Sequence, residues 1–131
     1  MKEVLQFLKK CKVFYVATVE GDQPRVRPFG IVEEFEGKLY IQTGKIKNVF
    51  KQLKINPKAE ICGYDNQGNW IRVETELYDD DRLEVKEYVL DLNPSLKAMY
   101  AADDGNTSVM YLKNSKATFY SFTQPPRIVE F

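Results

Sequence analysis

Short extended runs separated by turn residues restrict this chain to a fold built on a β-sheet. The run VFYVATV, residues 13–19, consists of β-branched and aromatic residues with one alanine, which favour strands. A turn at residues 20–23 leads into a second extended run from Arg25 to Phe35, and Glu36-Gly37 then reverses the chain into KLYIQT. Three strands joined by such short turns predict an antiparallel meander.

The second half of the chain continues in the same way. AEICGY and WIRVETELY flank a turn at residues 65–69, and VMYL and ATFYSF are predicted as two last strands before Pro125-Pro126 and an extended tail. So many short strands at close spacing indicate a closed or nearly closed antiparallel barrel. We therefore predict a mainly β (α+β) fold of six to seven strands with flanking helices, formed by residues 1–131 as a single domain.

Three helices and one further short helix are predicted to flank the sheet. An amphipathic helix opens the chain and ends near Lys10. A second helix has apolar residues at i, i+3, i+4 and i+7, namely Ile46, Val49, Phe50 and Leu53, and ends at Asn56-Pro57. A third follows Asp79-Asp80-Asp81, which we expect to cap it, and Asn93-Pro94 separates it from a short helix through Tyr100.

The chain contains no histidine, which excludes Ser-His catalysis, His-ligated zinc and His-ligated haem. No metal site is predicted. Cys11 and Cys62 lie far apart without a CxxC motif, so we expect buried, reduced side chains in a cytoplasmic protein. The 19 basic and 19 acidic residues balance, and no apolar run approaches about 20 residues. Nucleic acids and membranes are therefore not expected partners.

Basic residues are concentrated between Glu36 and Glu60, a segment with six lysines and no acid between those two glutamates. Such a run is often only a solvated helix face. Here, however, Thr43-Gly44-Lys45 joins a predicted strand to a predicted helix, where free backbone N–H groups and the helix dipole favour an anion. Thr43, Lys45 and Lys47, with Arg27 from the neighbouring strand, are candidates for a phosphate site.

Trp70 begins an alternating strand on the same side as Arg72, opposite Ile71 and Val73. A tryptophan on the polar face of a strand favours a subunit interface or a planar ligand such as a flavin ring, with ordinary surface packing as the alternative.

These motifs together resemble one known family. The segments GDQPRVRPFGIVEEFEGKLYIQTGKIKNVFKQLKINPKAEI and GNWIRVETELYDDD are similar to the pyridoxamine 5'-phosphate oxidase-like FMN-binding split barrels. The forms RPFG and TGKIKNVFKQL look like its small stand-alone members, a group that includes nitroimidazole-reductase-like proteins. The resemblance covers nearly the whole chain and implies a split β-barrel.

The resemblance also implies a homodimer that binds FMN in a groove between its two subunits. Carried onto this chain, it implies phosphate contacts from the second strand and from the start of the following helix, ring or ribityl contacts from the third strand, and a ring contact from the opposite subunit. The residues implied by the resemblance are Arg27, Gln42, Thr43, Lys47, Asn48 and Trp70; with Lys45 from the charge pattern and Pro28 and Phe29 beside Arg27, the predicted cofactor-binding set has nine members.

The expected function is that of an FMN-dependent oxidoreductase acting on a small molecule, since the flavin supplies the redox chemistry. No residue identifies the substrate or a catalytic side chain. Vitamin B6 phosphate oxidation does not fit, because the chain lacks the C-terminal Arg and His segment of those oxidases. The alternative is a non-catalytic module that binds a flavin or another phosphorylated ligand as a sensor or store.

Overall fold

The computed structural model describes residues 1–131 as an antiparallel sheet with helices on both sides. The helices are α1 (Lys2–Cys11), α2 (Asn48–Ile55), α3 (Leu83–Leu92) and the 3-10 helix η1 (Pro94–Ala98). The strands are β1 (Phe14–Glu20), β2 (Gln23–Phe29), β3 (Val32–Phe35), β4 (Lys38–Gly44), β5 (Lys58–Tyr64), β6 (Asn69–Asp80), β7 (Thr107–Ser121) and β8 (Arg127–Glu130).

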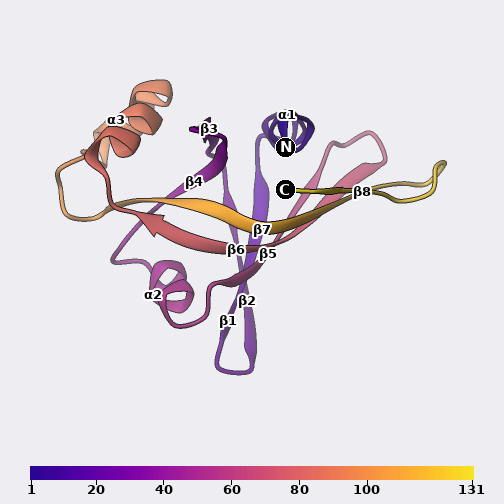
Figure 1. The fold of residues 1–131 in the computed structure, drawn as a ribbon, viewed down its shortest axis with the longest axis horizontal. Helices are drawn as coiled ribbons and strands as arrows, with labels where there is room; N and C mark the ends of the chain where they lie inside the picture. Colours follow the sequence, from indigo (N-terminus) through magenta and orange to yellow (C-terminus); the bar gives the residue numbers. More distant parts are fainter.

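The strand order is β2-β1-β5-β6-β7-β4-β3, and β8 pairs with β7 beside this path. In Figure 1 the long strands β6 and β7 run side by side across the centre, with α1 and α3 on one side and α2 and the turn of the β1–β2 hairpin on the other. The predicted mainly β split barrel with flanking helices is confirmed, although it has eight strands instead of six or seven.

The predicted meander is wrong, because the run from Arg25 to Phe35 forms two strands that do not pair with each other. β2 pairs only with β1 and β3 only with β4, so the two strands lie at opposite ends of the sheet. Pro24 and Pro28 in β2 have no N–H to donate, and their backbone nitrogens face the same side of the strand. A second partner strand on that side would lack these hydrogen bonds, so β2 is confined to an edge. The chain leaves the strand at residues 30–31.

The two last predicted strands are also wrong, because they form the single strand β7 of 15 residues. Asn114 adopts a positive φ of 52°, and the register with β6 shifts between Glu74 and Glu76. This bulge lets one strand pair with β6 along most of its length, with β4 at one end and with β8 near the other. The extended tail predicted after Pro126 is β8.

Two helix starts differ from the prediction. α2 begins at Asn48, after a turn at residues 45–46, so Ile46 lies outside it and is 75% exposed. β6 continues through Asp80, the N-cap of α3 is Arg82, and no side chain caps that helix. The aspartates at 79–81 do not cap α3: their carboxylates accept bonds from side chains of β4, β7 and the turn before α2, and Asp81 also pairs with Lys86 inside α3.

The core is built from apolar residues of α1, α2 and the inward faces of the strands. Sixteen buried residues form the main cluster, among them Val4 and Leu8 of α1, Phe14 and Val16 of β1, Val49 and Leu53 of α2, and Ile61, Ile71 and Val73 of the central strands. A smaller cluster joins α3 to β4 and β7 through Tyr40, Val85, Val89 and Val109. These contacts fix α2 and α3 on the sheet.

Both cysteines are free, as predicted, but Cys11 and Cys62 are partly exposed and not buried. Cys11 ends α1 and Cys62 lies on β5, whose alternate side chains point away from the core. None of the helices is long and apolar enough to cross a membrane.

Candidate functional site

A hollow of about 440 Å³ lies between β2, β4, the start of α2 and the segment that contains η1. Six of the nine residues that the sequence indicated line it, namely Arg27, Pro28, Phe29, Gln42, Thr43 and Lys47. A second hollow of about 500 Å³ adjoins it, shares Arg27, Lys47 and Val49, and adds Asn48 and Gln52. The structure thus brings seven of the nine residues together.

Arg27 is one of two cationic residues that line both hollows. Its Nη1 donates hydrogen bonds to the Val16 carbonyl oxygen at 3.1 Å and to Thr18 Oγ1 at 2.7 Å, and its Nη2 donates to Gln52 Oε1 at 2.7 Å. All of these acceptors are neutral. Burial, together with the nearby Arg25 charge, lowers the pKa of Arg27 from its ordinary value, yet a guanidinium stays protonated at neutral pH.

Lys47 precedes the first turn of α2 and forms no ion pair. It occupies the N-cap position, and no side chain accepts a hydrogen bond from the first-turn N–H groups of the helix. Those groups have no partner within the helix and lie at the positive end of its dipole. Asn48, the first residue of α2, lines the adjoining hollow. The cationic side of the site therefore combines Arg27, Lys47 and a helix N-terminus.

Gln42 and Thr43 lie on β4 and are both buried. Gln42 Nε2 donates to the Thr43 carbonyl oxygen at 3.1 Å. The next residue, Gly44, is closely approached by Tyr100, since a Cβ at Gly44 would lie 3.2 Å from two Tyr100 side-chain atoms. The absence of a side chain at position 44 therefore lets Tyr100 pack at the end of β4.

The apolar wall of the hollow was only partly predicted from the sequence. Pro28 and Phe29 come from β2, while Leu96, Met99 and Tyr100 come from η1 and the residues after it. Sequence reasoning placed a short helix there but gave it no role in the site. No local pattern signals this role, because the segment lies beside β2 and β4 only as a result of the tertiary packing that follows α3.

Gln52 and Thr18 were also missed by the sequence analysis. Gln52 lies at i+3 from Val49 and directly before Leu53, so it is a polar residue on the buried face of α2. A polar side chain at an apolar helical position is the signal that would have found it.

Two of the predicted residues lie elsewhere in the subunit. Lys45 Nζ donates to Asp81 Oδ1 at 2.9 Å, and this bond raises the pKa of Lys45. Trp70 lies on the outer face of the sheet, stacked on Tyr120 with centroids 5.4 Å apart and an interplanar angle of 8°, and next to Phe122. Neither residue lines the hollows beside Arg27.

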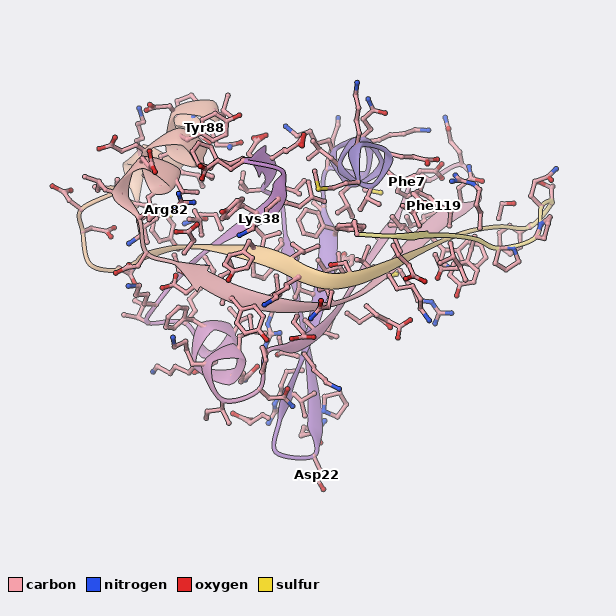
Figure 2. The ribbon with its side chains drawn as sticks, in the orientation of Figure 1. Phe7, Asp22, Lys38, Arg82, Tyr88 and Phe119 are labelled. Carbon is pink, nitrogen blue, oxygen red and sulfur yellow. The ribbon has the colours of Figure 1, made fainter.

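Another pocket of about 420 Å³ lies between α1 and the end of β7. Phe7 and Phe119, labelled in Figure 2, meet edge to face there with ring centroids 5.7 Å apart. Its cations are already compensated, because Arg127 pairs with Glu3 and Lys10 lies 3.6 Å from Asp65. The hollows beside Arg27 are therefore the better candidate for binding an anion.

An antiparallel split barrel with a cationic hollow between a strand edge and a helix N-terminus defines the structural class of this protein. The chain belongs to the pyridoxamine 5'-phosphate oxidase family, whose sequence model matches residues 1–121.

Solved structures agree with this assignment. A NimC/NimA family protein from Clostridium acetobutylicum is 52% identical, with a TM-score of 0.97 over 100% of this chain and 92% of that one. General stress protein 26 from Bacillus anthracis is 19% identical (TM-score 0.76, 99% and 98% covered), and a FAD-binding protein from Mesorhizobium loti is 15% identical (TM-score 0.65, 92% and 94% covered). The last two share the fold. No curated protein sequence matches the chain.

Proposed function

We propose that this chain is an FMN-binding flavoprotein and an oxidoreductase that acts on a small molecule. The observation that carries the proposal is the pair of cations, Arg27 and Lys47, which line the same hollow and have no carboxylate partner. Unpaired cations beside a helix N-terminus suit a phosphate monoester, which carries two negative charges and accepts several hydrogen bonds. Membership of the family supports the same ligand class.

The residues present fit the two ends of FMN. Arg27, Lys47, Asn48 and the first turn of α2 would hold the phosphate, and Thr43 and Gln42 would lie toward the ribityl chain. Pro28, Phe29, Leu96 and Met99 offer apolar surface to the ring system. No second cationic cluster lines these hollows for a further phosphate, which favours FMN over FAD.

When bound, the flavin supplies hydride transfer, and the protein supplies position, electrostatics and exclusion of water. Without histidine, the side chains at the hollow that can hold a proton are the Tyr100 hydroxyl and the Lys47 ammonium group. The walls from β2 and the η1 segment would shield one side of the ring from solvent.

The proposal includes a homodimer with FMN at the subunit interface. Trp70 supports it, because this partly exposed aromatic residue lies on the outer face of the sheet with Tyr120 and Phe122, and Phe122 is itself 81% exposed. Exposed aromatic clusters commonly mark interfaces. We expect light scattering to give twice the 15.2 kDa subunit mass, whereas a stable monomer that still binds FMN would contradict this assembly.

The test of the phosphate site compares FMN, riboflavin and FAD by titration. Wild type should prefer FMN, and Arg27→Ala or Lys47→Ala should lower FMN affinity about 10- to 100-fold because each removes a charge-assisted hydrogen bond. Lys54→Ala, in the last turn of α2, is the matched control and should bind FMN normally. A protein that takes up no flavin would refute the proposal.

The alternative is a module that binds the flavin without catalysis. Bound flavin that is neither reduced by NAD(P)H nor turned over with any electron acceptor would favour that alternative.

A further inference from the structure

The Arg27 guanidinium is held in a closed set of hydrogen bonds with Thr18 and Gln52. Arg27 donates to Thr18 Oγ1 and to Gln52 Oε1, each at 2.7 Å, and the oxygens of Thr18 and Gln52 lie 2.6 Å apart. A guanidinium can only donate, so the Gln52 atom that faces it must be the oxygen. Thr18 then accepts from Arg27 and donates its own proton to Gln52.

This arrangement leaves the charge of Arg27 uncompensated. The one acidic residue that lines the two hollows is Glu20, and its Oε1 is taken by Arg25 Nε at 3.0 Å and Nη2 at 2.9 Å. A glutamate at position 52 would have the same shape and would bind the guanidinium more strongly, but it would also cancel its charge.

The two side chains that accept hydrogen bonds from the Arg27 guanidinium are buried, which restricts the orientation of the guanidinium. Thr18 of β1 is 2% exposed and Gln52 of α2 is 6% exposed. Gln52 lies on the face of α2 that carries the core residues Val49 and Leu53. Water therefore does not compete for these bonds as it does at the surface. Gln52 Nε2 donates no hydrogen bond within the chain and is not sealed in the core, so the amide keeps a free donor beside the hollow that it lines.

We infer that Gln52 and Thr18 are positioning residues that orient Arg27 through neutral acceptors and so keep its full charge available to a phosphate group. This inference rests on the proposed function and adds to it the residues that make Arg27 selective for the phosphate end of the ligand. The choice of an amide instead of a carboxylate at position 52 is thus a determinant of phosphate recognition.

The test measures the ratio of riboflavin to FMN dissociation constants and, separately, the rise in melting temperature caused by inorganic phosphate over chloride at equal ionic strength. Gln52→Glu should lower FMN affinity about 10- to 100-fold and leave riboflavin affinity unchanged, because it neutralises Arg27 without removing an acceptor. It should also abolish the stabilisation by phosphate. Gln124→Glu, an exposed substitution in the loop before β8, is the matched control and should behave as wild type.

A second variant separates position from charge. Gln52→Met removes the acceptor but adds no charge, so we expect a smaller loss of FMN affinity, about 3- to 10-fold. Equal losses of FMN affinity in Gln52→Met and Gln52→Glu would overturn the claim that a neutral residue at position 52 keeps the charge of Arg27 available. If Gln52→Glu keeps the wild-type flavin ratio and phosphate stabilisation, the inference is overturned.

The phosphate measurement also separates this inference from the proposed function. A wild type that binds no flavin but is stabilised by phosphate, with the stabilisation lost in Gln52→Glu, refutes the flavoprotein and supports the positioning role. A wild type that responds neither to flavin nor to phosphate overturns both.

Discussion

Lys86 Nζ lies 2.6 Å from Asp81 Oδ1, and the Lys86 side chain is 6% exposed whereas that of Asp81 is 68% exposed. The same carboxylate oxygen accepts a bond of 2.9 Å from Lys45. Asp81 therefore joins α3 to the turn that precedes α2, although the sequence suggested a helix cap. Through this residue, which directly follows β6, α3 is tied to the turn that leads into α2.

Asp81→Asn should destabilise the protein more than Lys45→Ala. The asparagine leaves the buried Lys86 ammonium without an anion, at a cost of about 1–3 kcal/mol, while the loss of Lys45 removes an outer pair worth about 0–1 kcal/mol. Urea unfolding followed by circular dichroism measures both. Equal effects of the two substitutions would contradict the role assigned to Asp81.

The stability of the protein should fall in acid between pH about 4 and about 2. The Arg82 hydrogen bond lowers the pKa of Asp80 to about 2, the Lys86 bond does the same for Asp81, and backbone N–H donation by Thr107 lowers that of Asp104 to about 2. The ordinary value is 3.8, so the unfolded chain takes up protons first as pH falls, and each proton favours unfolding.

Unfolding free energies measured from pH 7 to pH 2 check this prediction. The Asp104 carboxylate accepts hydrogen bonds from the N–H groups of Ala101, Asn106 and Thr107, and these bonds are strongest when the carboxylate is ionised. Asp104→Asn should therefore make the unfolding free energy fall less steeply with pH in acid. A curve whose fall is complete above pH 4 would show that other groups control acid unfolding.

Asn114 should tolerate glycine but not valine. Its φ of 52° lies in the left-handed region, where a β-branched residue is strained by about 1–2 kcal/mol and glycine is not. Asn114→Val should therefore lower the melting temperature. The melting temperature of Asn114→Gly should stay near that of wild type, because the lost hydrogen bond from Asn114 to Glu76 is exposed and contributes little to stability. Tolerance of valine would mean that β7 pairs with β6 without this bulge.

Trp70→Ala should lower the affinities for FMN and for riboflavin by the same factor, about 5- to 10-fold. The reason is that the proposed contact from the opposite subunit is with the flavin ring and not with the phosphate. This pattern differs from that of Arg27→Ala, which affects only FMN. Titration followed by flavin fluorescence measures both ligands, with light scattering to verify that the variant keeps its assembly. Tyr88→Ala, which removes a partly exposed ring on α3, is the control. Unchanged binding of both flavins by Trp70→Ala would refute the contact.

Several elements could be predicted from the sequence because their signals are local. The spacing of Val49, Phe50 and Leu53 identified α2, and the alternation around Ile71 and Val73 identified β6. The segment of lysines without acids contains a predicted strand-to-helix junction at Thr43-Gly44-Lys45, and this combination pointed to the hollow beside Arg27. The absence of histidine excluded whole classes of chemistry before any fold was known.

Pairing between distant segments could not be predicted in this way. The extended run from Arg25 to Phe35 was predicted as one strand, but it forms β2 and β3, which pair with different strands at opposite edges of the sheet. Lys45 and Lys47 are equivalent by sequence, yet Asp81, 36 residues further along the chain than Lys45, engages Lys45.

The antiparallel class, the existence of the helices and the basic charge near the site could be predicted from the sequence, because periodicity and composition depend on neighbours a few residues apart. Tertiary packing sets which cations lack a carboxylate partner and which side chains hold Arg27 in place. Thr18, Arg27 and Gln52 come from β1, β2 and α2 and meet only when α2 packs on the sheet. Hydrogen bonds between such distant residues depend on the packing of the core that brings them together, and no local pattern encodes that packing.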